Sequence, residues 1–207
     1  MHSDEHALER LRDFLKRERF DLLIFCGDIT TGGPLSYAED FLELMKASEL
    51  RAVGVFGNMD DESVRELLEK RGVSLHGRRI EVSGFGLVGF GGSPVGPFST
   101  PTEFSEEEIY EALGGLKIDE NTVLVTHAPP YNTGMDLTRS GVAAGSKSIR
   151  RIIEERQPLV NVCGHIHEQE GEARLGRTVI VKVAPASRLR AAVLELGKEA
   201  RASFISF

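Results

Sequence analysis

Apolar and polar residues follow one another along the chain in blocks that predict an ordered series of strands and helices. Short, continuous apolar runs, typical of strands buried on both faces, end near Cys26, Phe56, Thr126 and Cys163. In other segments, such as 7–19, leucines recur at helical spacing. This order predicts an α/β domain with mixed sheets.

The ends of the predicted elements are marked by proline, glycine and capping residues. Pro34 favours the start of one helix, and Ser105 with Glu108 has the spacing of a capping box at the start of another. No linker or repeat divides the chain, so we expect a single domain over residues 1–207. The expected helices are 7–19, 34–50, 61–71, 105–113 and 146–156, and the expected strands are 21–26, 52–56, 79–82, 85–90, 122–126, 159–163, 178–183, 191–196 and 201–206.

Composition narrows the classes of function. The formal net charge of -7 argues against a nucleic-acid-binding surface, which is normally basic. No apolar run approaches the roughly 20 residues that span a bilayer, and the polar first residues are unlike a signal peptide. The two cysteines, Cys26 and Cys163, do not form a disulfide framework, so a reducing, cytoplasmic location is expected.

Side chains able to bind metals follow four of the predicted strands. Asp28, Asn58 and His127 come after three of them, and His165 and His167 come after a fourth. Sites in α/β sheets form beyond the carboxyl ends of strands, so we expect these residues to lie together. A carboxylate, an amide oxygen and imidazoles suit Mn, Fe, Zn, Co or Ni better than Ca or Mg.

The same residues carry a resemblance to a known family. The chain resembles the calcineurin-like metallophosphoesterases over nearly its whole length, and more narrowly the Icc-related predicted phosphoesterases. The motifs that carry this resemblance are, in order, Asp4-Glu5-His6, Gly27-Asp28, Gly57-Asn58-Met59-Asp60, His127 and Gly164-His165-Ile166-His167. The resemblance implies a four-layer αββα sandwich with two mixed β-sheets.

The resemblance further implies a site for two divalent metal ions, with manganese as the first candidate. One ion would take Asp4, His6, Asp28 and His167, and the other Asp28, Asn58, His127 and His165, so that Asp28 bridges them. Asp28, Asn58 and His127 are also the expected catalytic residues. Two cations roughly 3.5–4 Å apart can hold a phosphate and activate a water for in-line attack. We therefore expect hydrolysis of a small phosphate ester, in particular a diester.

Two departures from the family pattern modify this expectation. Met59 stands where many members have a histidine that can protonate the leaving group, and a thioether cannot donate a proton. We therefore expect activity mainly on leaving groups of low pKa. Only three residues precede Asp4, so the first strand of the family fold is expected to be missing or truncated, with Asp4 and His6 weakly held.

Alternative functions remain open at this point. A protein-interaction scaffold of the same fold is one, and a nucleotide-directed enzyme such as a cyclic nucleotide phosphodiesterase is another. Tyr131, Asn132 and Arg139 either line a substrate pocket or are merely exposed, whereas His2 and His76 belong to no motif and are expected to face solvent. The sequence does not decide between a monomer and a homo-oligomer.

Overall fold

The computed structural model describes residues 1–207 as five α-helices, one 3-10 helix and twelve strands. Every helix and strand expected from the apolar pattern is present, with ends shifted by a few residues. None of the helices combines the length and the apolar character needed to cross a membrane.

In chain order the elements are α1 (Glu5–Leu15), β1 (Leu23–Cys26), α2 (Leu35–Ala47), β2 (Ala52–Val55), α3 (Glu62–Lys70), β3 (Arg78–Val82), β4 (Phe85–Phe90), β5 (Ser93–Pro94), β6 (Glu103–Phe104), α4 (Glu106–Gly114), β7 (Thr122–Thr126), α5 (Lys147–Arg156), β8 (Val160–Cys163), β9 (Gly171–Leu175), β10 (Thr178–Lys182), η1 (Ala186–Arg188), β11 (Arg190–Leu196) and β12 (Ala200–Ser206).

The largest sheet has six strands in the order β3-β4-β7-β8-β10-β9. β4, β7, β8 and β10 run parallel to one another, and β3 and β9 add antiparallel edges. All residues of β7, β8 and β10 are buried. Burial on both faces explains why these strands read as continuous apolar runs in the sequence.

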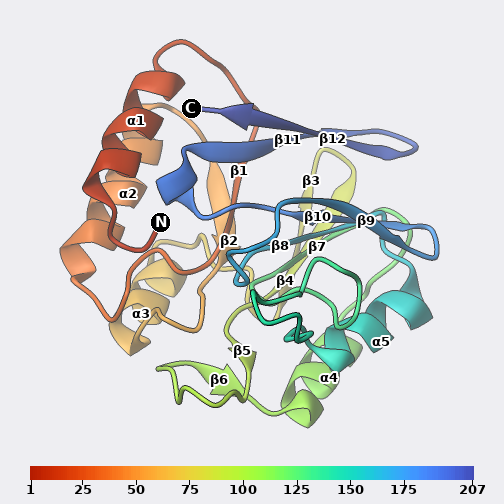
Figure 1. Ribbon diagram of the computed structural model, residues 1–207. Coiled ribbons are helices and arrows are strands. Elements are labelled where there is room, and N and C mark those ends of the chain that lie inside the picture. Colours follow the sequence, from red (N-terminus) through yellow and green to blue (C-terminus); the bar gives the residue numbers. More distant parts are fainter.

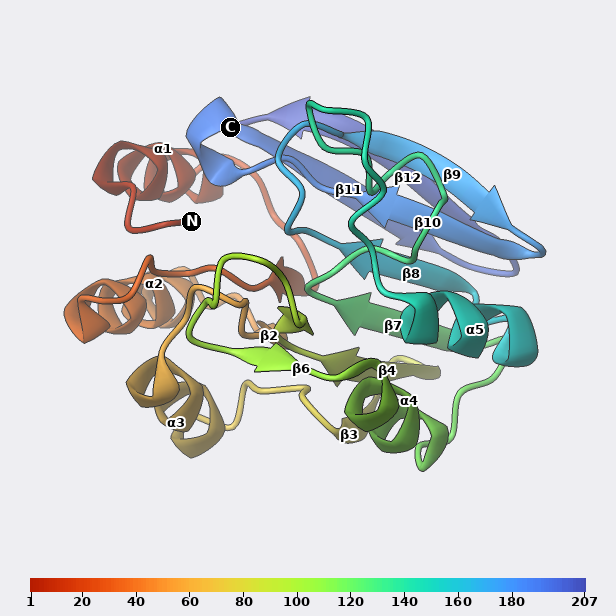
Figure 2. The ribbon, with the colours of Figure 1, turned by 60° about the horizontal axis from the view of Figure 1, so that its bottom comes forward.

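Alternate residues of the central strands enter two separate cores. Val88 and Leu124 point to one face, where they pack with Ile109 of α4 and Ile152 of α5. Figure 2 shows α4 and α5 lying together over this face of the sheet. Their amphipathic pattern follows from that contact, because one stripe of each helix is covered by the sheet.

Two strand pairs cover the opposite face of the large sheet. β1 and β2 form a parallel pair, and β11 and β12 form an antiparallel pair. Both pairs share a core with the large sheet, and α1, α2 and α3 pack on the far side of β1 and β2 (Figure 1). The expected sandwich with helices outside and strands inside is confirmed, with its second strand layer divided into two pairs.

A cavity of about 710 Å³ lies between β1 and β11. Each of these strands has only one strand partner, so each carries one unpaired edge, and both line the cavity. Leu11 and Phe14 of α1 contribute further apolar wall, and Met1 and His2 also line the space. The second strand layer is therefore interrupted between β1 and β11.

The short strands β5 and β6, the 3-10 helix η1, the edge strand β9 and the position of His76 were not predicted from the sequence. The edge strand β9 alternates exposed and partly buried residues and has no apolar run to mark it. His76 was expected to face solvent, but its ring packs between Phe56 and Phe90, with ring centroids 4.6 and 4.7 Å away. Its Nδ1 accepts a hydrogen bond from the backbone N–H of Gly91 at 3.0 Å, so His76 is part of the packing of β4.

Candidate metal centre

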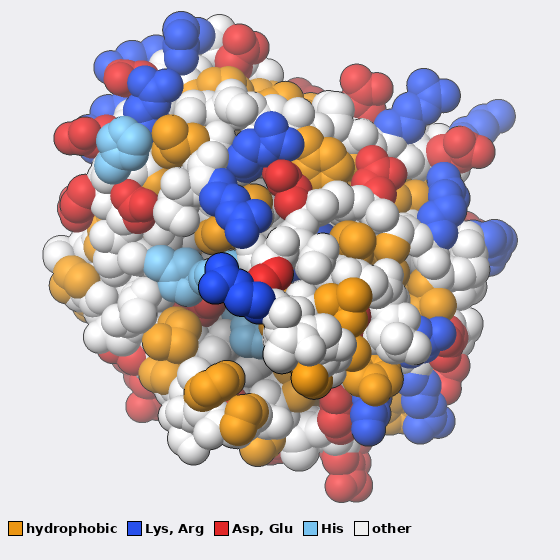
Figure 3. Space-filling view, in the orientation of Figure 1, with side chains coloured by type: hydrophobic (Ala, Val, Ile, Leu, Met, Phe, Trp, Pro, Cys, Tyr) orange, Lys and Arg blue, Asp and Glu red, His pale blue; other side chains and the backbone are white.

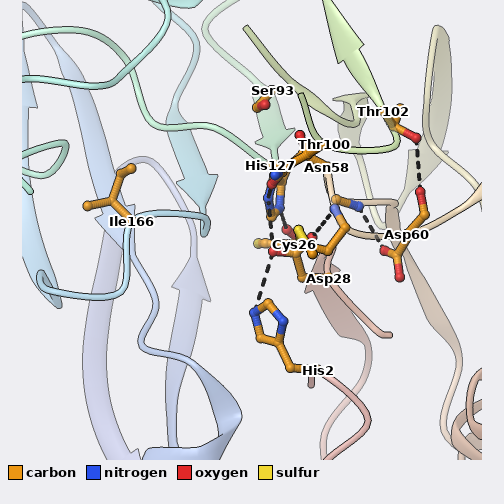
Figure 4. A network of polar contacts seen from close by, with 12 residues as sticks. His2, Cys26, Asp28, Asn58, Asp60, Ser93, Thr100, Thr102, His127 and Ile166 are labelled. Atoms are coloured by element: carbon orange, nitrogen blue, oxygen red, sulfur yellow. Dashed lines mark hydrogen bonds and ion pairs between the residues drawn. The ribbon is translucent and has the colours of Figure 1, made fainter. Parts of the chain in front are cut away.

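The carboxyl ends of β1, β2, β7 and β8 meet at one place and bring the predicted polar residues together. Cys26 lies level with Val55 in the first strand pair, and Thr126 lies level with Cys163 in the large sheet. The residues that follow these ends are therefore neighbours in space although they are far apart in the chain. Figure 4 shows His127 pointing toward Asn58 and Asp28.

Glycines permit this close approach of strand ends. Gly27 has a φ of +87°, a conformation that favours glycine, and it turns the chain sharply out of β1. A Cβ on Gly57 would collide with the carboxylate of Asp28. Asp28 itself has a φ of +50°, which directs its carboxylate back toward the ends of the other strands. The Gly-Asp and Gly-Asn pairs are therefore required by the backbone geometry of the site.

Asp28, His127 and His165 form the first of two candidate ligand groups, which we call the inner group. Their potential ligand atoms lie within 4.8 Å of one another. The Nε2 atom of His127 is 3.4 Å from Oδ2 of Asp28 and 2.8 Å from Oδ1 of Asn58. The imidazole of His127 is buried, with an exposed fraction of 1%.

Hydrogen bonding around His127 favours a cation in the inner group. Its Nδ1 lies 2.6 Å from the carbonyl oxygen of Cys26, which can only accept, so Nδ1 carries a proton. Nε2 then faces two oxygens that accept, those of Asn58 and Asp28. Such an arrangement is favourable when a proton or a metal ion lies among the three atoms. This donor set of two oxygens and imidazole nitrogens fits a divalent transition metal.

His2, Asp28 and His167 form the second group, called here the outer group. The Nε2 atom of His2 is 3.0 Å from Nε2 of His167 and 3.4 Å from Oδ2 of Asp28. The same carboxylate oxygen therefore faces both groups, while Oδ1 accepts a hydrogen bond from the backbone N–H of Met59 at 2.9 Å. Asp28 is therefore the residue that the two groups share.

The N-terminal residues of the site differ from those expected. Asp4 does not join either group, because its side chain accepts a hydrogen bond from the backbone N–H of Ala7 and caps α1. His6 is exposed on α1. His2, which was expected to face solvent, lies at the site and is oriented by Thr31, whose Oγ1 is 3.1 Å from its Nδ1. His2 was missed because no motif surrounds it and because Asp4-Glu5-His6 offered a motif-like match just after it.

Burial controls the protonation of most of these groups. It lowers the pKa of His165 to about 3 and that of His2 to about 4, and it also lowers the pKa of His167. These imidazoles are therefore neutral near pH 7, which is the form that binds metals. Burial alone would raise the pKa of Asp28, but His127 and His2 beside it hold it well below its usual range.

His127 is affected in the opposite direction. Burial lowers its pKa, but the Asp28 carboxylate and the hydrogen bond to Cys26 together raise it above the usual value. The raised pKa means that the surroundings of His127 favour a positive charge at its imidazole, next to the Asp28 carboxylate.

Two buried charged residues make hydrogen bonds to the backbone segments that carry the site residues. The Asp60 carboxylate accepts hydrogen bonds from the backbone N–H groups of Ile29, Thr30 and Gly57, and so joins the turns that follow β1 and β2. Lys182 of β10 is fully buried, and its ammonium group donates to the carbonyl oxygens of Ile166 and Val183. Nothing in the sequence indicated that Lys182 would hold the loop between the two histidines, because it lies inside an ordinary strand pattern.

Comparison with known proteins adds to this description. A sequence model described as calcineurin-like phosphoesterase matches residues 1–169. An uncharacterized protein of Methanocaldococcus jannaschii, MJ1162, is 37% identical over 187 residues, which cover 87% of this chain and 83% of that protein.

Two solved structures are similar in fold. TT1561 of Thermus thermophilus has a TM-score of 0.75 and 16% identity, and the match covers 98% of this chain and 94% of that one. A dimetal phosphatase from Danio rerio has a TM-score of 0.60 and 14% identity, over 88% and 79% of the two chains.

Proposed function

Since this chain belongs to the calcineurin-like phosphoesterase family, we propose that it is a two-metal phosphodiesterase for substrates with leaving groups of low pKa. The observation that carries the proposal is the convergence of two ligand groups on the single carboxylate of Asp28. A hydrolase with two ions needs a bridging ligand of this kind, whereas a structural metal site would be closed by four ligands around one ion.

In this proposal the inner group and Asn58 hold one divalent ion, and the outer group holds the other. Two such ions would bind the phosphate, lower the pKa of an attacking water and stabilise the charge of an in-line displacement. Met59 N–H occupies Oδ1 of Asp28, so Oδ2, which faces His2 and His127, is the oxygen that would hold the ions. Manganese is the ion we would test first, with iron, zinc, cobalt and nickel as alternatives.

The chain's own residues suggest a limit on the leaving group. Met59 follows Asn58 directly, and its thioether cannot donate a proton to a departing alkoxide. The histidines of the site other than His127 have lowered pKa values and would be poor sources of a proton near pH 7. A leaving group that is stable as an anion does not need protonation, so such esters are the expected substrates.

The first test is metal content and hydrolysis by the full chain. After incubation with manganese and desalting, we expect about two ions per chain and hydrolysis of bis(p-nitrophenyl) phosphate. A useful control is Asp13→Asn, since Asp13 is an exposed residue of α1 that pairs only with Lys16. Absence of hydrolysis with every one of the five metals would overturn the proposal.

A second measurement addresses the leaving group. Aryl phosphodiesters of graded phenol pKa should show a rate that falls steeply as that pKa rises. The variant Met59→His should flatten the dependence by supplying a side chain that can carry a proton. A flat dependence in the unmodified protein would contradict the role assigned to Met59.

A further inference from the structure

A second cavity, of about 350 Å³, opens beside the candidate metal centre. His165 of the inner group and His167 of the outer group both line it, so it adjoins both proposed ions. Arg139, Arg188 and Glu168 form most of the remaining wall. Figure 3 shows histidine surfaces adjoining Lys or Arg side chains near the middle of this face of the molecule.

The two arginines come from separate segments of the chain. Arg139 lies in the long loop between β7 and α5, and Arg188 is the last residue of the 3-10 helix η1. The loop of Arg139 is tied to the site, because its backbone N–H donates to Oε1 of Glu168 at 3.1 Å. Glu168 directly follows His167, so this contact fixes the loop relative to the outer group.

Neither guanidinium group makes a hydrogen bond or an ion pair within the chain. Arg190, only two residues after Arg188, pairs with Glu170 at 3.1 Å, so acidic partners are within reach of this segment. The chain as a whole has 32 acidic and 25 basic side chains, whereas the wall of this cavity has two arginines and one glutamate. The only carboxylate in the cavity wall, Glu168, accepts a hydrogen bond from Arg139 N–H.

An exposed arginine on its own is commonly a solvated surface residue. Here the two cations line a single space, they come from different segments, and His165 and His167 of the two ligand groups line the same space. Guanidinium groups bind phosphate and carboxylate oxygens through charge-assisted hydrogen bonds, often in pairs. The two guanidinium groups in this wall therefore suit an anionic group attached to the ester.

We propose that Arg139 and Arg188 bind a second phosphate group of the substrate, in addition to the ester held at the metal centre. This inference rests on the proposed function and narrows its substrates to phosphodiesters that carry a further phosphate, such as phosphorylated nucleotides. Both arginines would contribute to substrate binding and selectivity, and neither would take part in the bond-breaking step.

Equilibrium binding to the manganese-loaded full chain tests the proposal without relying on turnover. The probes are thymidine 3′,5′-bisphosphate and thymidine 5′-monophosphate, compared at one fixed ionic strength because exposed charges are screened by salt. We expect the bisphosphate to bind about tenfold more tightly, as two charge-assisted contacts would allow. The variant Arg139→Gln with Arg188→Gln should remove this difference and leave the monophosphate affinity within about twofold.

Arg174→Gln with Arg177→Gln is the matched control. Both residues are exposed at the β9–β10 hairpin and are not part of the cavity, so the control removes the same net charge from the chain. It should leave the preference for the bisphosphate intact. An equal loss in the control, or equal binding of the two probes by the unmodified protein, would overturn the proposal.

Turnover separates this proposal from the proposed function. Thymidine 5′-(p-nitrophenyl phosphate), with and without a 3′-phosphate, should differ in KM rather than in kcat, and the double variant should abolish the difference. Failure of both esters to react, with the binding preference still present, would contradict the hydrolase but support the arginine site. Hydrolysis of both with equal KM would support the hydrolase and contradict the arginine site.

Discussion

The inner and outer groups offer similar side chains to a metal ion, but the fold holds them very differently. His127 of the inner group and the adjacent Asn58 are 1% and 5% exposed, and each follows a strand whose residues are all buried. In the outer group, His167 is exposed and the side chain of His2 is 26% exposed. His2 also lies on a short N-terminal segment held by a few backbone hydrogen bonds to Asp28 and Ile29.

Because of this difference in preorganisation, the two groups should bind metal ions with different affinities. Ligands fixed by surrounding packing lose little conformational entropy on binding, whereas mobile ligands must be ordered by the ion itself. We expect the inner ion to bind more tightly and to remain when the outer ion is lost. The difference between the groups lies in how the backbone is anchored, since both use imidazoles and share Asp28.

The largest effect is expected from Asp28→Asn, because Asp28 belongs to both groups. Asparagine keeps the acceptor for Met59 N–H but removes the charge that faces both ions. Hydrolysis should fall by about 10⁴-fold, because the loss of ion binding removes several kcal/mol of charge stabilisation. Metal analysis should show both ions weakened together. Loss of only one ion would mean that Asp28 does not bridge.

Comparison of His127→Gln with His2→Gln tests the difference between the groups directly. The first variant should lower the rate by about 10³-fold, as removal of a preorganised group at a developing charge commonly does. His2→Gln should lower the rate by only about tenfold, because the His2 side chain is already loosely held. Metal content per chain should show the inner ion retained in His2→Gln. Equal losses in both variants would contradict the ranking.

The outer group could be strengthened by extending the chain from Met1. The terminal amino group donates to the backbone carbonyl oxygen of Asp28 at 2.7 Å. Burial lowers the pKa of this amino group, which means that its position disfavours the charged form and would suit a neutral peptide N–H. An apolar, strand-forming segment of about six residues would span roughly 20 Å. It could pair with the free edges of β1 and β11 and fill the cavity between them.

We expect this extension to raise the affinity of the outer ion by about tenfold, through ordering of His2. The inner ion should be unchanged. A Gly-Ser extension of the same length is the control, because it removes the terminal charge but cannot fill an apolar space. Equal gains from both extensions would show that the terminal charge, and not the unfilled cavity between β1 and β11, weakens the outer group.

Much of this architecture could be predicted from the sequence because its strands are buried on both faces. Continuous apolar runs marked β1, β2, β7 and β8, and the polar residues after each run marked where they converge. The helix cap at Ser105 could also be predicted, since capping residues act through contacts only three positions away.

The missed features depend on contacts between distant segments. Asp4 and His6 matched a motif in the sequence, but the backbone uses Asp4 as a helix cap and brings His2 to the site instead. Lys182 could not be recognised because two of its partners, the carbonyl oxygens of Ile166 and Gln169, lie in a loop 13 or more residues away. The presence of Arg139 and Arg188 in the wall of one cavity likewise follows only from the tertiary fold.

The smallest expected effect is on acid stability, and it also distinguishes the groups. The pKa values of His165 and His2 in the folded, metal-free protein are lowered to about 3 and about 4. The unfolded chain, with histidine pKa values of about 6.5, therefore takes up protons first as the pH falls. Stability should be fully present above about pH 6.5 and decline progressively below it.

Replacing a site histidine should make this decline shallower. Between about pH 6.5 and about pH 4.5, metal-free His165→Asn should lose about 2 kcal/mol less than the unmodified chain, measured by urea unfolding. His2→Asn should reduce the loss of unfolding free energy by a smaller amount, because the side chain of His2 is partly exposed to water. His127 acts in the opposite sense, since its raised pKa adds stability at low pH that is lost as pH rises through the folded value. His6→Asn, at an exposed position on α1, is the control; an equal recovery there would show that the acid loss does not arise at the metal centre.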